Sequence, residues 1–250
     1  MLTSGPFLCM TRVILTPDVI KGSDLAGIYL DKFELNELAR RNYRRQILVA
    51  QYVYSRLALK ILLSRNLSIP VGNISIRSDS DGSPNVLLEH IKSELISVSI
   101  SHDNLHILVA FCLGSHCAVD IQGVNHVDWT LVMQAMGWSE QLKNPILDAR
   151  TLKALKKWPS SFVCALVWCS YEVWMKLTRC REVLSNFAWD EIYFVEEDPS
   201  TCDTLFRLVL HDNSSIGNQK FKRFKMSWFF HQANFRQNSL PSIFIISAFP

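Results

Sequence analysis

Two stretches of the sequence place charged residues in apolar surroundings, where a charge needs a partner. In the first, Ala118 to Gln122, strand alternation puts Asp120 and Gln122 on the face opposite Val119 and Ile121. An Asp between two β-branched residues is unfavourable in a strand, and a hard cation or a basic partner is its usual compensation. The segment indicates a candidate cation site, the alternative being an edge-strand Asp that faces water.

The second stretch is predicted to be a helix in which a spacing of four places Trp168, Glu172 and Lys176 on one face. The neighbours along this helix are apolar nearly all round, so the helix should be buried. A buried Glu and a buried Lys cost free energy unless they are paired or bound to a ligand. One interpretation is a plain ion pair between Glu172 and Lys176, but the apolar setting favours a functional site.

A third feature is a local concentration of positive charge. No Asp or Glu occurs between Leu38 and Ser78. Apolar residues recur at three- and four-residue steps, which predicts one long amphipathic helix from about Leu35 to Leu63, with basic residues crowded at its N-terminal end. The basic face is either solvated or a phosphate site, because helix N-termini and clustered arginines both favour anions. The basic residues of the segment are Arg40, Arg41, Arg44, Arg45, Arg56, Lys60, Arg65 and Arg77.

The elements that position these residues follow a helix-then-strands order that occurs twice. The turn-forming run from Ser78 to Pro84 predicts a connecting loop. Ser101 and His102 end a strand at a turn, where they either reach a ligand or face solvent. The order predicts an α+β fold of two similar halves, 1–118 and 119–250. Strands are predicted at 95–101, 106–113, 117–121, 191–196, 204–210, 224–231 and 243–248, and helices at 125–136, 151–157 and 161–177.

Composition narrows the class of protein. With 250 residues, 48% hydrophobic, the chain should fold as one large domain or two packed halves. A net charge of +3 is too small for a histone-like nucleic-acid coat. Seven cysteines without a C-x-x-C pair predict buried, reduced thiols that act as small hydrophobic residues in a cytoplasmic protein without zinc. Neither a signal peptide nor a membrane span is predicted.

The motifs, taken in order, resemble a known family. Gly82-Ser83-Pro84, Ile100-Ser101-His102, Val119-Asp120-Ile121-Gln122 and Trp168-x-x-x-Glu172-x-x-x-Lys176 are similar to the successive motifs of the 4′-phosphopantetheinyl transferases of the surfactin-synthetase-activating type. That pattern is Gly-Lys-Pro, (I/V)-Ser-His-Ser, Gly-(V/I)-Asp-(I/V)-Glu and Trp-x-x-Lys-Glu-Ala-x-x-Lys. The resemblance runs from about residue 40 to 176, and the closing strand at 245–248 fits the end of the second half.

The resemblance implies a monomeric pseudo-dimer of two α/β halves that binds coenzyme A between them. Such an enzyme, a holo-[acyl-carrier-protein] synthase, moves the phosphopantetheine arm of coenzyme A to a serine of an apo acyl or peptidyl carrier protein and releases adenosine 3′,5′-bisphosphate. By resemblance, Asp120 and Glu172 bind Mg²⁺, with Gln122 at the third protein position. Glu172 activates the carrier serine, and Lys176 neutralises or protonates the departing phosphate. Nucleic acid and membrane are not among the implied partners.

The resemblance also implies a set of contacts to coenzyme A. Ser101 and His102 match positions that contact the nucleotide phosphates, and Lys176 reaches the same phosphates. The positive charges that bind the 3′-phosphate match arginines near the N-terminal end of the predicted basic helix. The implied coenzyme A residues are Arg41, Arg44, Arg45, Gly82, Pro84, Ser101, His102 and Lys176.

Several positions depart from the family pattern. Ser83 and Tyr171 stand where the family often has lysine, and Gln122 offers a neutral carbonyl in place of a carboxylate. Asp103 replaces the second Ser of the Ser-His-Ser motif. These changes motivate an alternative hypothesis, a weakened paralogue that binds carrier protein or coenzyme A without transfer. A third hypothesis, nucleic-acid binding by the basic run at 40–45, lacks interleaved aromatic residues. The sequence does not identify the carrier protein.

Overall fold

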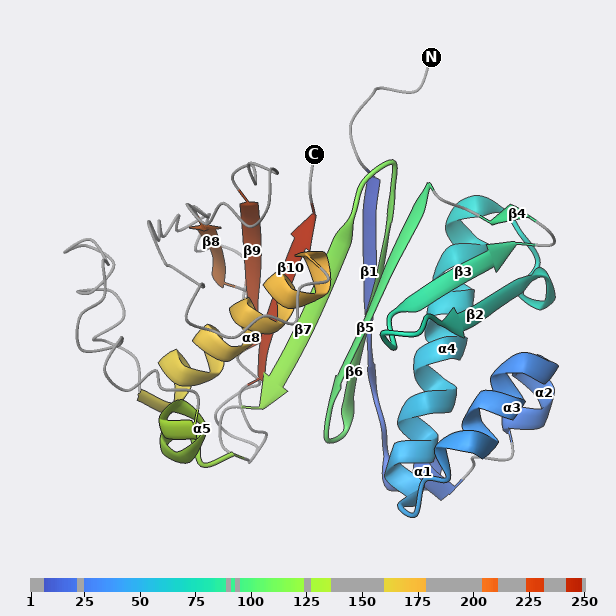
Figure 1. The fold of residues 1–250 in the computed structure, drawn as a ribbon, viewed down its shortest axis with the longest axis horizontal. Helices are drawn as coiled ribbons and strands as arrows, with labels where there is room; N and C mark the ends of the chain where they lie inside the picture. The colour runs from blue at the N-terminus through green and yellow to red at the C-terminus, as the bar shows by residue number, and fades with distance from the viewer. Residues whose placement is uncertain are drawn as a thin grey trace. The chain divides into compact units, whose positions relative to one another are not determined.

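The chain forms two compact units, Met1–Val119 with Ala248–Pro250, and Asp120–Ser247. We refer to them as unit 1 and unit 2. The predicted boundary between residues 118 and 119 lies next to this division, while the likeness of the two halves stays a prediction. The structure, a computed structural model (Figure 1), describes residues 7–21, 25–88, 91–92, 95–123, 127–135, 160–178, 204–210, 224–231 and 242–248.

The main sheet of unit 1 is antiparallel, with the strand order β1-β6-β5. Its central strand, β6, is buried from Ile107 to Cys112, which explains why its sequence is a nearly continuous apolar run instead of an alternating one. The prediction for this strand matches its bounds, and the strand predicted at 95–101 begins one residue later and ends two residues later. The strands are β1 (Phe7–Ile14), β5 (Ile96–Asp103) and β6 (His106–Leu113).

A second sheet of unit 1 has the order β2-β3-β4. Its first two strands form a hairpin in which Ser78 pairs with Pro84, so the predicted loop at 78–84 is confirmed as a hairpin turn. Gly82 adopts a φ of 84°, a left-handed conformation that favours glycine. Its N–H donates to Asp79 O at 2.9 Å, closing the turn. The strands are β2 (Ile74–Ser78), preceded by the 3₁₀ turn η2 (Val71–Asn73), β3 (Pro84–Leu88) and β4 (Ile91–Lys92).

The core of unit 1 forms around α4 (Gln46–Leu67), which packs against β1, β2 and β6. Leu59, Leu63 and Phe111 are fully buried in this cluster. Within the described residues, α4 is long and apolar enough to cross a membrane, but most of its apolar stretch is buried inside unit 1. It is packed as the central helix of a hydrophobic core.

The prediction of one helix from Leu35 to Leu63 is wrong, because two helices occupy this stretch. α3 (Lys32–Arg41) begins at a capping box, in which Asp31 accepts from the Glu34 N–H and Glu34 accepts from the Asp31 N–H. It ends at Asn42, whose left-handed φ of 45° stops the helix before α4 starts. The short helices α1 (Pro17–Lys21) and α2 (Ala26–Tyr29) precede α3.

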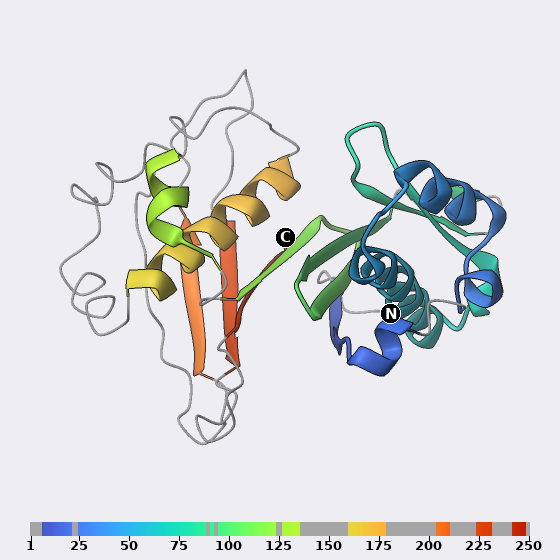
Figure 2. The ribbon, with the colours of Figure 1, turned by 90° about the horizontal axis from the view of Figure 1, so that it is seen from below.

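Unit 2 has a sheet of order β7-β10-β9-β8, and α8 lies across one face of it (Figures 1 and 2). The predicted strands at 204–210 and 224–231 match the bounds of β8 and β9. The helix predicted at 151–157 and the strand at 191–196 lie outside the described residues. The elements are β7 (Cys117–Gly123), α5 (Trp129–Ala135), α8 (Ser160–Thr178), β8 (Thr204–Leu210), β9 (Phe224–His231) and β10 (Ser242–Ala248).

Candidate active site

Asp120 on β7 is the centre of the candidate site. Its side chain is only 3% exposed, so the alternative of an edge-strand Asp facing water is wrong. Lys176 on α8 donates from Nζ to Asp120 Oδ1 at 2.8 Å. Gln122 donates from Nε2 to Asp120 Oδ2 at 3.4 Å, which is a long hydrogen bond. The ion pair therefore joins the strand to the helix. Each of these two charges thus has the partner that its apolar surroundings were expected to require.

The local sequence explains how β7 presents this carboxylate. Val119 and Ile121 are fully buried, as expected for the packing face of an alternating strand. Asp120 and Gln122 lie on the opposite face, but Asp120 is buried there too and Gln122 is half-buried. Both faces of β7 are thus covered around Asp120, and the polar face is met by the charged stripe of α8.

Glu172 shares the electrostatic environment of this ion pair. Burial raises the pKa of Glu172; Lys176 lowers it and Asp120 raises it, and the net effect is a raised pKa. The side chain is half-buried. Because both Asp120 and Lys176 act on Glu172, the two carboxylates and the ammonium group belong to one site. Among the described residues, this group consists of two acids and one base, so these three side chains carry more negative than positive charge when the acids are ionised.

The donor set of this site fits a hard divalent cation. Mg²⁺ takes one or two protein carboxylates, completing its shell with substrate phosphate oxygens and water. Asp120 and Glu172 supply that number, and a cation would stabilise the ionised form of Glu172, whose pKa burial raises. Within the described part of the chain, no group of three or more His, Cys, Asp or Glu side chains could hold a metal ion. The expected third position, Gln122, contributes an amide.

Cys169 is a residue of this site that the sequence analysis treated as a plain small hydrophobic residue. It is fully buried on α8. Burial and the nearby charge of Asp120 hold the pKa of the Cys169 thiol well above its usual value. The spacing contained a signal, because Cys169, Glu172 and Lys176 are three and four residues apart and share one helix stripe.

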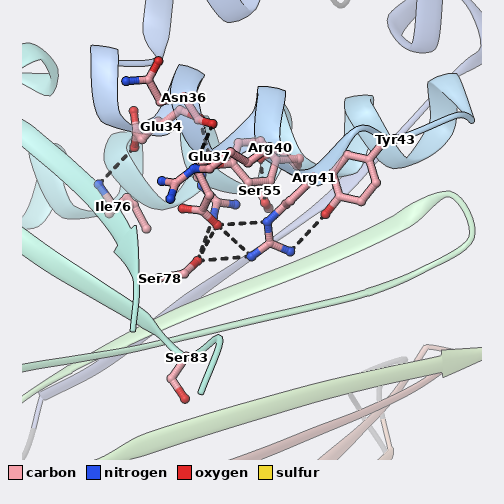
Figure 3. A network of polar contacts seen from close by, with 12 residues as sticks. Glu34, Asn36, Glu37, Arg40, Arg41, Tyr43, Ser55, Ile76, Ser78 and Ser83 are labelled. Atoms are coloured by element: carbon pink, nitrogen blue, oxygen red, sulfur yellow. Dashed lines mark hydrogen bonds and ion pairs between the residues drawn. The ribbon is translucent and has the colours of Figure 1, made fainter. Parts of the chain in front are cut away.

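The basic segment of unit 1 is partly a structural feature. Arg41 donates from Nη2 to Glu37 Oε1 at 2.7 Å and to Ser78 Oγ at 3.3 Å, and from Nη1 to Tyr43 Oη at 3.1 Å (Figure 3). Arg44 and Arg45 are exposed just before the N-terminus of α4. Of the three arginines expected to bind a phosphate, Arg41 is thus held by one carboxylate and two hydroxyl groups. The other two are exposed to solvent.

Two other basic residues of the segment are buried on α4. Arg56 donates to Glu37 Oε1 at 3.2 Å, and its guanidinium lies over the Tyr52 ring at 3.4 Å from the centroid. Lys60 pairs with Glu34 at 2.6 Å. Neither is the solvated charge or the phosphate ligand that the sequence pattern suggested. Their acidic partners, Glu34 and Glu37, precede the acid-free stretch that begins at Leu38. The composition of that stretch alone therefore did not show that these two positive charges are paired.

The other residues expected at a coenzyme A site belong to unit 1. Gly82 lies in the β2–β3 turn and Pro84 begins β3. On β5, Ser97 Oγ accepts from Cys117 N at 3.0 Å and Ser99 Oγ accepts from Val119 N at 3.0 Å. Two further residues complete this strand end: Ser101, which shares the serine face and is buried, and His102, which is exposed beside the turn.

Comparisons with known proteins give little to set beside this geometry. No family model and no curated protein matches the sequence. Among solved structures, the chain is similar to the holo-ACP-synthase from Plasmodium yoelii, with 19% identity over 44% of this chain and 97% of that chain, and a TM-score of 0.35. Because these values are low, the function has to follow from the chain's own residues.

Proposed function

We propose that this protein is a 4′-phosphopantetheinyl transferase. It would transfer the phosphopantetheine arm of coenzyme A to a serine of an apo acyl or peptidyl carrier protein, with Mg²⁺, as a monomer in the cytoplasm. The observation that carries the proposal is the ion pair of Asp120 on β7 with Lys176 on α8, whose two charges both act on Glu172. These are the residues of the two motifs to which the family resemblance assigns metal binding and catalysis.

The bond changes of the reaction define what the site must do. The serine oxygen attacks the phosphorus that carries the pantetheine, and the bond from that phosphorus to the bridging oxygen breaks. Adenosine 3′,5′-bisphosphate leaves with the electron pair of that bond. The serine proton must go to a base, and the leaving phosphate must be neutralised. Phosphoryl transfer of this kind needs positioning and electrostatics more than covalent help from the protein.

The residues of unit 2 suit these tasks. Asp120 and Glu172 would hold Mg²⁺, whose chemistry when bound is to screen the diphosphate and stabilise charge on the leaving phosphate. Glu172, to which the family resemblance assigns activation of the carrier serine, would accept the serine proton. Lys176, whose side chain is 29% exposed, supplies positive charge to the departing phosphate.

Unit 1 would supply the contacts to coenzyme A. Arg44 and Arg45 are exposed at the start of α4, where the positive end of the helix dipole also favours a phosphate. Arg41 adds its charge to this region, although Glu37 shares it. We assign the remaining coenzyme A contacts to Gly82, Pro84, Ser101, His102 and Lys176.

The test is an incubation of the full-length protein with coenzyme A, Mg²⁺ and apo carrier proteins, followed by the intact mass of each carrier. The expected result is one added phosphopantetheine on at least one carrier. A carrier in which the acceptor serine is replaced by alanine is the control and should gain no mass. The absence of added mass on fatty-acid, polyketide, nonribosomal-peptide and lysine-pathway carriers would contradict the proposal.

A second function is favoured by one contact of the site. Gln122 turns its amide N–H toward Asp120, and with Lys176 it satisfies the carboxylate that should bind the metal. A site stabilised in this way suits a weakened paralogue that binds coenzyme A or carrier protein without transfer. Coenzyme A binding measured by calorimetry, combined with unchanged carrier mass, would select this function over the transferase.

A further inference from the structure

One face of β5 carries serines, and this face is covered by protein. Val98 and Ile100 pack in the hydrophobic core of unit 1. Strand alternation places Ser97 and Ser99 on the opposite face, where Ser99 is only 4% exposed and Ser97 is half-buried. A buried hydroxyl group costs free energy unless it forms a hydrogen bond. These two serines therefore need hydrogen-bond partners from another element.

The backbone of β7 supplies these partners. The Cys117 N–H donates to Ser97 Oγ at 3.0 Å, and Cys117 Sγ donates to Ser97 O at 3.4 Å. Two residues further along both strands, the Val119 N–H donates to Ser99 Oγ, also at 3.0 Å. Because the two serines and the two amides have the same spacing, the bonds specify one register of β7 against β5. All four residues belong to unit 1.

The bond to Ser99 lies next to a residue of the candidate site. Val119 directly precedes Asp120 on β7, and the Val119 side chain is fully buried. The hydrogen bond holds the backbone of Val119 and packing holds its side chain, so β7 cannot slip here without losing both. A slip of one residue would move Asp120 to the other face of the strand, away from Lys176, its partner at 2.8 Å.

We infer that Ser99 is a positioning residue that holds β7 in register and thereby orients the Asp120 carboxylate for a divalent cation. The inference rests on the proposed function, because it concerns the same site. Ser99 acts through the backbone of Val119 and touches neither substrate nor metal. Removal of a group that supports a metal ligand typically weakens metal binding by about 10- to 100-fold, and we expect the lower end of this range because Ser99 acts indirectly.

The experiment compares the full-length wild type with Ser99→Ala, which removes the acceptor of the Val119 N–H. Hydrogen exchange of the Val119 amide, followed by nuclear magnetic resonance, should become roughly tenfold faster, the effect of one lost hydrogen bond. Mn²⁺ affinity, measured by electron paramagnetic resonance, should weaken roughly tenfold. In the transfer assay, Ser99→Ala should raise the Mg²⁺ concentration required more than it lowers kcat.

Ser55→Ala is the matched control, because Ser55 is another buried serine of unit 1. It is 1% exposed, and its Oγ donates to Tyr52 O at 3.0 Å within α4. Its replacement should leave Mn²⁺ affinity unchanged. Ser97→Ala removes the bond that lies further from Asp120, so it should weaken Mn²⁺ binding less than Ser99→Ala does. If Ser99→Ala does not fold, Ser97→Ala decides: weaker Mn²⁺ binding supports the positioning role and unchanged binding overturns it.

The outcomes separate this inference from the proposed function. Weaker Mn²⁺ binding in Ser99→Ala than in Ser55→Ala supports the positioning role whether or not the wild type modifies a carrier. Unchanged Mn²⁺ affinity in Ser99→Ala, or an equal loss in Ser55→Ala, overturns the positioning role and leaves the proposed function standing. Wild-type protein that binds no Mn²⁺ also overturns the positioning role. Wild-type protein that binds Mn²⁺ but modifies no carrier overturns the proposed function alone.

Discussion

Unit 1 and unit 2 each contain a buried ion pair, and the two pairs differ in how completely their charges are compensated. In unit 1, Glu34 and Lys60 are 2.6 Å apart, with side chains 0% and 2% exposed. In unit 2, Asp120 and Lys176 are 2.8 Å apart, but the lysine side chain is 29% exposed. The first pair is sealed in the core and the second is open on one side.

The Glu34–Lys60 pair makes several further hydrogen bonds within the protein. Glu34 also accepts from Asp31 N at 2.8 Å and from Ile76 N at 3.0 Å. Lys60 also donates to Tyr29 O at 3.0 Å. These bonds are all to groups of unit 1 itself, and the pair links α2, α3, α4 and β2. This arrangement is that of a structural pair.

The pair in unit 2 has a second acid beside it. Glu172 feels the charges of both Asp120 and Lys176 and keeps a raised pKa. Surplus charge and partial exposure are what a site needs to exchange a protein cation for a metal ion or a substrate. A buried ion pair with an additional charge beside it is therefore a candidate functional site. A buried ion pair whose hydrogen bonds are all made within the protein is a structural feature.

The largest effect is expected from breaking the structural pair. Lys60→Met leaves the Glu34 carboxylate buried without its counter-ion and should lower the free energy of unfolding by about 3–5 kcal/mol. Urea denaturation followed by circular dichroism measures this loss. The double variant Glu34→Gln with Lys60→Met should recover part of it. A loss of less than 1 kcal/mol, typical of a surface pair, would contradict the structural role.

The next effect concerns the unbalanced pair. Glu172→Gln keeps the size of the side chain but removes the base and a metal ligand, so transfer should fall by about 100- to 1,000-fold. The rate of mass gain by the carrier measures it. Thermal unfolding should show little loss of stability, because the buried charge is removed and not created. Retained transfer in this variant would remove Glu172 from the mechanism.

A smaller effect is expected at the start of α4. Arg45→Ala removes an exposed charge from the proposed phosphate contact and should raise the KM for coenzyme A roughly tenfold, the value of a hydrogen bond to a charged group. Arg65→Ala, an exposed arginine in the last turn of α4, is the control and should not change KM. Equal effects of the two variants would indicate general charge attraction.

The smallest effect is a pH dependence in unit 1. Burial raises the pKa of Glu37, but the bonds from Ser78 and Arg41 and the charge of Arg56 outweigh it, so the pKa is lowered from 4.5. A lowered pKa in the folded state stabilises the protein above pH 4.5, and this stability is lost as pH falls through the folded value. Urea unfolding should show Glu37→Gln less stable than wild type at pH 7, with the difference shrinking in acid. A constant difference would contradict the assignment.

The sequence predicted the elements whose patterns are local. β6, β8 and β9 match their predicted bounds, and α8 extends one residue beyond its prediction at each end. The break between α3 and α4 was missed because it depends on Asn42 in a left-handed conformation, which the surrounding helical periodicity hides. The partners of Arg56 and Lys60 were missed because they come from α3, outside the acid-free window.

The candidate site shows the same division. Spacing predicted that Glu172 and Lys176 share a helix face, and alternation predicted that Asp120 lies on the strand face opposite its apolar neighbours, but neither could give the pairing of Lys176 with Asp120. That pairing is a long-range contact between β7 and α8. The place of Cys169 beside these charges was missed for a different reason: composition favoured a hydrophobic cysteine, although its spacing from Glu172 pointed to the charged stripe.

The most direct test of the central claim is where a divalent cation binds. We propose anomalous diffraction at the manganese edge from crystals of the full-length protein grown with Mn²⁺ and coenzyme A. The account predicts a manganese peak within coordination distance of carboxylate oxygens of both Asp120 and Glu172, with Lys176 turned toward a phosphate. A peak that contacts only one of these carboxylates, or a coenzyme A diphosphate bound away from them, would contradict it.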